Sequence, residues 1–204
     1  MDDETRRGIE AFRRWVDETK PGRMVFFGGA GVSTESGIPD FRSPDGLYAQ
    51  KYPHPPEQMI SRSFFDAHPA EFFAFYGDRM LALDAQPNRA HRKLADLERA
   101  GTLSAVVTQN IHGLHQKAGS ERVLELHGSV LRNFCMDCGA AYPVDELLRL
   151  RDEAADGVPR CPACGGIVKP DVVLYEEALD ERTLQGSVDA IAHADLLVVA
   201  GTSL

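Results

Sequence analysis

The sequence has a deficit of basic residues, no long apolar run and no basic leader. Its 22 Lys and Arg residues face 31 Asp and Glu residues, giving a formal net charge of −9 at pH 7. Because binding to nucleic-acid phosphates needs clustered Lys and Arg, this balance argues against direct nucleic-acid binding. No apolar run approaches a membrane span, and residues 2–4 are acidic where a signal peptide is basic. We therefore expect a cytoplasmic protein that binds neither nucleic acid nor membrane.

Cysteine is also scarce, since the 204 residues include only four, in two Cys-x-x-Cys pairs. In a reducing compartment this pattern favours thiolate metal ligands over disulfides. Gly139 and Gly165-Gly166 follow the pairs and can adopt the positive φ that such turns require. Four thiolates would complete a tetrahedral shell and leave no position for water or substrate. The sequence therefore predicts one structural Zn²⁺ held by Cys135, Cys138, Cys161 and Cys164, with a thioredoxin-like redox pair as the alternative.

A glycine-rich segment, residues 28–43, lacks the marks of the commonest nucleotide-binding loops. No Lys-Ser or Lys-Thr follows its glycines, as a P-loop requires, and Thr34 replaces the third Gly of the dinucleotide fingerprint. Gln50 and Lys51 stand near the place where that fingerprint has an acidic residue. The segment nevertheless follows a short apolar run, residues 24–27, and open α/β sheets bind ligands after such strands. It is the first candidate ligand site, with a purely structural glycine turn as the alternative.

Three short apolar runs, residues 24–27, 103–107 and 196–200, each end in small or amide residues. A helix capped by Asn88 and ended by Gly101 is expected between the first two. Strand and helix alternating in this way predict a parallel sheet, with the polar ends of the three runs gathered at one edge.

His127 lies beside a glycine after an apolar run, a setting in which an imidazole can face a cleft. Its side chain titrates nearest neutrality, so it is the natural general base. A lone histidine is more often structural, and His112 and His115 are rivals for the role.

Together these motifs resemble the sirtuin family of NAD-dependent protein lysine deacylases. The resemblance covers residues 9–204 and rests on residues 29–43, residues 108–115, His127-Gly128-Ser129, the paired Cys-x-x-Cys motifs and Gly201-Thr202-Ser203. It implies an α/β fold in which a Rossmann-like parallel sheet is joined to a small zinc-binding and helical module. The Rossmann-like domain would comprise residues 1–48, 86–133 and 170–204, the helical part of the module residues 49–85, and the zinc-binding part residues 134–169.

The resemblance also implies a role for each residue of the site. NAD would lie against Ala30, Thr34, Phe41, Arg42, Gln109, Ile111, His112, Gly201, Thr202 and Ser203. His127 would be the catalytic base, with Asn110 as a second catalytic residue, and Val172 and Val173 would pair with the substrate backbone as an added strand. The implied reaction removes acetyl groups from lysine side chains of proteins and gives nicotinamide and O-acyl-ADP-ribose. Mono-ADP-ribosylation of protein is a further possibility.

Three departures from the family pattern carry expectations of their own. His112 stands where the family commonly has Asp, and a neutral imidazole can still accept a hydrogen bond through one nitrogen. Residues 174–177, Leu-Tyr-Glu-Glu, replace the common aromatic-Phe-Gly-Glu run and change the acyl-lysine tunnel. Sirtuins continue past Gly-Thr-Ser-Leu, so we expect a truncated chain with an incomplete sheet. This leaves a catalytically impaired module that binds acyl-lysine or ADP-ribose as the alternative function.

Overall fold

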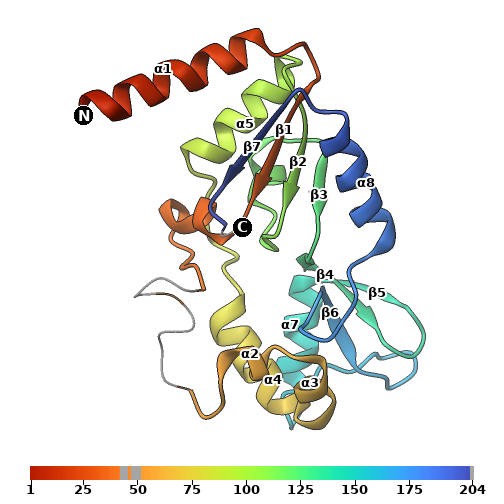
Figure 1. Ribbon diagram of the computed structural model, residues 1–204. Coiled ribbons are helices and arrows are strands. Elements are labelled where there is room, and N and C mark those ends of the chain that lie inside the picture. The colour runs from red at the N-terminus through yellow and green to blue at the C-terminus, as the bar shows by residue number, and fades with distance from the viewer. Residues whose placement is uncertain (42–45, 47–51, 203–204) are drawn as a thin grey trace.

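A four-stranded parallel sheet forms the centre of the computed structural model, which describes residues 1–41, 46 and 52–202 (Figure 1). The strand order is β3-β2-β1-β7. The strands are β1 (Met24–Gly28), β2 (Leu103–Thr108), β3 (Val123–Glu125) and β7 (Leu196–Ala200). All three pairings are parallel, which confirms the predicted sheet.

The register of this sheet brings the polar ends of the strands together. Gly28, the last residue of β1, pairs with Thr108 of β2 on one side and with Ala200 of β7 on the other. The segments that follow the three strands therefore start at the same edge, as the apolar runs predicted.

Helices cover both faces of the sheet, because alternate strand residues point to opposite sides. Helix α5 (Arg89–Arg99) lies on one face and α8 (Glu181–Ala192) on the other, while α6 (Leu114–Ala118) packs against α5. One face buries Met24, Phe26, Leu94, Leu103 and Val106, and the other buries Val25, Ala105, Val107, Leu126 and Ala190.

Local signals set the ends of the helices. Asn88 begins α5 with a capping box, and Gly101, at φ 75°, follows its end. Helix α1 (Asp3–Glu18) projects from the body of the molecule (Figure 1) and packs through Val16. No described helix is long and apolar enough to cross a membrane.

The second part of the molecule combines short helices with a three-stranded antiparallel sheet. Its helices are α2 (Pro56–Met59), α3 (Arg62–Ala67), α4 (Pro69–Phe75), the π-helical turn η3 (Tyr76–Met80) and α7 (Val144–Glu153). The sheet runs β5 (Ala141–Pro143), β4 (Gly128–Cys135) and β6 (Val168–Val172). Phe65, Phe72 and Phe73 meet edge to face at its centre and are 1% exposed or less. The proposed domain boundaries at 133/134 and 169/170 fall within β4 and β6 and stay a prediction.

Two histidines are buried together where α5 packs against α6. His91 is 0% exposed and His115 2%, with ring centroids 4.7 Å apart. Nε2 of His91 and both ring nitrogens of His115 have no hydrogen-bond partner within the described chain. Burial lowers the pKa of His91 to about 4, and burial together with the neighbouring imidazole lowers that of His115 to about 3. Neutral rings are therefore packed here at physiological pH.

This pair should make the fold sensitive to acid. In the unfolded chain the imidazoles have pKa values near 6.5 and bind protons, whereas in the folded chain they stay neutral. The free energy of unfolding therefore falls as pH drops from about 6.5 toward 4. Each histidine should lower the free energy of unfolding by about 2 kcal/mol at pH 5. We expect His115→Leu to unfold at higher urea than the parent chain at pH 5 and to flatten the pH dependence between 7.5 and 5. His193→Leu, at an exposed position, controls for loss of an imidazole, and an equal slope in His115→Leu would contradict the account.

Candidate active site

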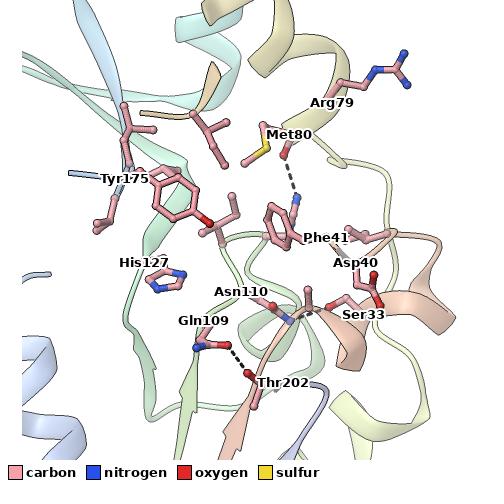
Figure 2. A pocket seen from close by; sticks show the side chains of 18 of the residues that line it. Ser33, Asp40, Phe41, Arg79, Met80, Gln109, Asn110, His127, Tyr175 and Thr202 are labelled. Carbon is pink, nitrogen blue, oxygen red and sulfur yellow. Dashed lines mark hydrogen bonds between the residues drawn. The ribbon is translucent and has the colours of Figure 1, made fainter. Parts of the chain in front are cut away.

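A cavity of about 750 Å³ lies between the carboxyl edge of the main sheet and the small module (Figure 2). Segments far apart in the sequence form its wall. These include Ala30, Gly31, Ser33, Ile38, Asp40, Phe41, Ile60, Arg79, Met80, Gln109, Asn110, Ile111, His112, His127, Val172, Val173, Leu174, Tyr175, Gly201 and Thr202. Most of the residues singled out from the sequence therefore come together at one place.

The glycine-rich turn packs directly against the end of β7. Gly29 donates its amide to Ala200 O at 3.2 Å, and Gly31 donates to Gly201 O at 2.9 Å. A Cβ on Gly29 would lie 2.7 Å from the Gly201 carbonyl oxygen, so glycine is needed for this close approach. The short 3₁₀ helix η1 (Ala30–Ser36) follows and presents Ala30 and Gly31 to the cavity. The glycines thus have a structural use and also shape the ligand wall.

Amide side chains after β2 are fixed by hydrogen bonds to both neighbouring strand ends. Asn110 donates through Nδ2 to Gly29 O at 3.0 Å and to Ser33 Oγ at 3.1 Å. Gln109 Oε1 accepts from the Thr202 hydroxyl at 2.9 Å (Figure 2). These bonds leave Asn110 Oδ1 as a polar atom held in a fixed orientation.

His127 is half-buried at the cavity wall, directly before β4. Burial lowers its pKa, and a hydrogen bond with the Gln109 backbone opposes that shift. Because the charged form is disfavoured, the imidazole is neutral near pH 7 and can accept a proton. Of the two other candidate histidines, His115 is buried where α6 packs against α5 and does not line the cavity.

His112 also lines the cavity, and its hydrogen bond fixes its tautomer. Nε2 lies 3.0 Å from the Met80 carbonyl oxygen, which can only accept, so Nε2 carries the proton. Nδ1 is then the acceptor nitrogen, as a neutral imidazole at this position was expected to provide. Burial lowers the pKa of His112, which keeps this acceptor at mildly acidic pH.

The structure does not bring every predicted residue to the cavity. Thr34 is exposed and donates its hydroxyl to Gly31 O at 3.0 Å, and the residue of this turn that lines the wall is its neighbour Ser33. Arg42 and Ser203 lie outside the described residues. Sequence reasoning missed Asp40, Arg79 and Met80, and it considered Tyr175 only as part of the run 174–177 that was expected to change the acyl-lysine tunnel. Asp40 sits next to Phe41 within the recognised motif and could have been included.

Val172 and Val173 line the cavity beside His127. The Val173 amide donates to the His127 carbonyl at 3.0 Å, and Val172 O accepts from Lys169 Nζ at 2.9 Å. These two groups are therefore already bonded, and an added peptide strand would have to use other backbone groups of the segment. Their pairing with a substrate stays a prediction.

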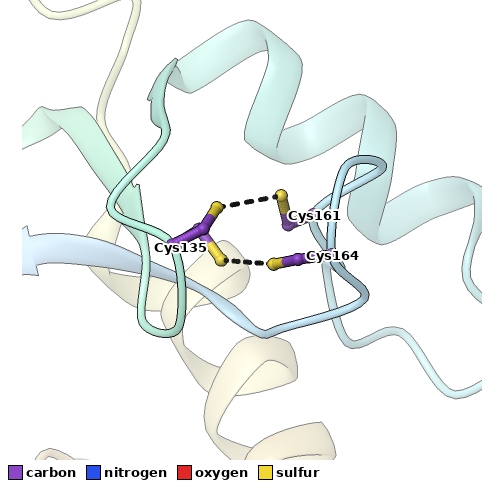
Figure 3. Close-up of side chains that lie close together, drawn as sticks. Cys135, Cys161 and Cys164 are labelled. Atoms are coloured by element: carbon purple, nitrogen blue, oxygen red, sulfur yellow. Dashed lines mark hydrogen bonds between the residues drawn. The ribbon is translucent and has the colours of Figure 1, made fainter.

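The four cysteines form one cluster outside the cavity (Figure 3). All are free thiols, and their Sγ atoms lie within 4.8 Å of one another, with Cys135–Cys164 at 3.4 Å and Cys138–Cys161 at 3.7 Å. Tetrahedral zinc with Zn–S bonds near 2.3 Å separates its sulfurs by about 3.8 Å. The cluster therefore fits one structural Zn²⁺ with four thiolate ligands.

Glycine turns and one tyrosine hydroxyl surround the cluster. Gly139 and Gly165 adopt φ 70° and 81°, as the turns after the two pairs were predicted to require. The Tyr142 hydroxyl donates to Cys161 Sγ at 3.0 Å and lowers the pKa of that thiol. Helix α7 and strand β5 occupy the gap between the two pairs.

Comparison with known proteins places this site in a family. The Sir2 family profile matches residues 29–204. The chain is 56% identical over 183 residues to an NAD-dependent protein deacetylase of Clostridium acetobutylicum, covering 89% of this chain and 73% of that one. It is 54% identical over 197 residues to one of Cutibacterium acnes, covering 96% and 78%. The chain belongs to the Sir2 family, which confirms the resemblance.

Solved structures agree with this assignment. A Sir2 structure described with a deacetylated p53 peptide and 3'-O-acetyl ADP ribose superposes with a TM-score of 0.87 at 36% identity, covering 95% of this chain and 76% of that one. A Sir2 structure with p53 peptide and NAD⁺ superposes at 0.83 and 36%, covering 95% and 75%.

Proposed function

We propose that this protein is an NAD-dependent protein lysine deacetylase that contains one structural zinc ion. The observation that carries the proposal is the convergence of Ala30, Asn110, His127 and Thr202 on one cavity at the carboxyl edge of the sheet. Its relatives at 54–56% identity are named for the same activity. None of these comparisons favours the alternative of an impaired binding module.

The residues at the cavity fit a bound dinucleotide. A glycine-shaped wall at Ala30 and Gly31 allows close approach of a ligand, and Thr202 offers a hydroxyl fixed by Gln109. NAD, when bound, supplies a glycosidic bond whose cleavage releases nicotinamide and lets the acyl group pass to ADP-ribose. Asn110 would orient the ribose side through Oδ1, and His112 would accept from the carboxamide through Nδ1.

His127 would remove a ribose hydroxyl proton, because its neutral imidazole faces the cavity. Phe41 would shield the sugar from water, since a competing nucleophile must be excluded. Arg42, Ile111, Gly201 and Ser203 complete the proposed NAD contacts, and Val172 and Val173 the substrate contacts. Acetylated lysine in proteins is the proposed substrate, the transfer to ADP-ribose would make the enzyme a transferase, and the cytoplasm is its proposed compartment.

Incubation with NAD and a lysine-acetylated peptide tests the proposal. We expect mass spectrometry to detect deacetylated peptide, nicotinamide and O-acetyl-ADP-ribose in equal amounts. A missing ADP-ribose product with the peptide still bound would favour the binding module instead. Transfer of label from NAD to protein would favour mono-ADP-ribosylation.

A further inference from the structure

Glu176 stands out among the described non-glycine residues because its backbone is left-handed, at φ 76°. This conformation is disfavoured for L-residues, since Cβ approaches a carbonyl oxygen. Such residues persist where the surrounding structure holds them, and they cluster at ligand sites. Glu176 lies in the loop of residues 173–177, which follows β6 and lines the cavity.

The carboxylate of Glu176 ties this loop to helix α3. Oε2 accepts from the Ser63 amide at 2.9 Å, and Oε1 accepts from the Ser63 hydroxyl at 3.0 Å. Ser63 lies in the first turn of α3, where backbone amides have no partner within the helix. The side chain therefore uses both carboxylate oxygens on one residue of another segment, and it does so from the left-handed backbone position.

The same loop positions Tyr175 over the cavity. The Tyr175 amide donates to Ile60 O and its carbonyl accepts from the Arg62 amide, both at 3.0 Å. The ring is 50% exposed and projects into the cavity on the side of His127 (Figure 2). Glu177 secures the other end of the loop, because it accepts from the Leu174 amide at 2.8 Å and from Lys169 at 3.1 Å.

Ile60, Met80, Ile111 and Leu174 line the same cavity as Tyr175 and are apolar, so they do not discriminate against a longer acyl chain by polarity. Discrimination against a longer acyl chain therefore has to be steric, and Tyr175 is the large, half-exposed side chain that projects into the cavity. Without the Glu176 carboxylate, the two backbone bonds of Tyr175 would remain. Residue 176 could then leave its left-handed conformation, which would shift the ring.

We propose that Glu176 is a positioning residue that sets acyl-chain selectivity by holding Tyr175 across the cavity. The inference rests on the proposed deacylase function. Loss of the tie should widen the channel, so that longer acyl chains gain more than acetyl does.

The test is the ratio of kcat/KM for an acetyl-lysine peptide to that for the hexanoyl-lysine form of the same peptide. This ratio does not depend on the fraction of active protein, so partial unfolding alone leaves it unchanged. In Glu176→Ala we expect the ratio to fall by at least about 10-fold, the lower end of the discrimination that a hydrophobic pocket provides for one methylene. Glu176→Gln retains an acceptor for the Ser63 amide and should recover most of the selectivity. Ser63→Ala keeps the amide bond and should be intermediate.

Glu57→Ala is the matched control, because it removes an exposed carboxylate from the neighbouring helix α2. An unchanged ratio in Glu176→Ala would overturn the inference, as would an equal fall in Glu57→Ala. Hydrogen exchange of residues 173–177 gives a readout independent of turnover, and it should be faster in Glu176→Ala than in the parent chain. If the parent chain converts neither peptide, the proposed function fails. Hydrogen exchange then tests whether Glu176 holds the loop. Equal exchange rates in Glu176→Ala and the parent chain would overturn this, and faster exchange in Glu176→Ala would support it.

Discussion

Replacing His127 with alanine should lower kcat/KM for an acetylated peptide by about 10²–10⁴-fold, the contribution usual for a positioned general base. The side chain is half-buried at the cavity wall, and burial lowers its pKa. It is therefore neutral near pH 7 and available to take a proton. His127→Ala should leave binding of the peptide and of the metal intact, because the cysteine cluster lies outside the cavity.

The pH profile gives this prediction a second readout. The pKa of His127 lies below the 6.5 of a free imidazole, so kcat/KM of the parent chain should fall only as pH drops below that value. The residual rate of His127→Ala should lack this limb. His193→Ala, at an exposed position on the C-terminal end of α8, is the matched control and should retain the parent profile. Equal activity in His127→Ala would refute its assignment as the base.

The convergence of strand ends was predictable because its signals are local. Apolar runs that end in small or amide residues gave β1, β2 and β7, and the register of Gly28 with Thr108 and Ala200 follows from parallel pairing. The cysteine spacing similarly predicted the cluster, since each Cys-x-x-Cys turn is closed by hydrogen bonds within its own few residues.

Contacts between distant segments could not be predicted in this way. The bond from His112 to Met80 O joins the loop after β2 to the end of η3, and its existence depends on how the aromatic helices pack. The tie between Glu176 and Ser63 likewise crosses more than one hundred residues of sequence. The 3₁₀ turn η1 also places Ser33 at the wall instead of the predicted Thr34.

Cys135→Ser should release the zinc and unfold the small module. Cys135 is 2% exposed, and both it and Cys161 belong to the hydrophobic cluster that contains Phe73, so the metal closes the core of this module. Structural zinc contributes about 10–16 kcal/mol of apparent binding free energy in zinc-finger peptides. Loss of one of four ligands should therefore remove most of the ordered structure built on β4 and β6.

The consequence should reach the active site, because β4 starts directly after His127 and β6 ends at Val172. We expect elemental analysis to find one zinc per parent chain and almost none in Cys135→Ser, with reduced helical circular dichroism and no deacetylation. The single tryptophan, Trp15, lies on α1 and should report little of this change. His127→Ala is the control that separates the two effects, since it should lose activity but keep its zinc. A Cys135→Ser chain with parent-like circular dichroism and turnover would contradict a structural role for the metal.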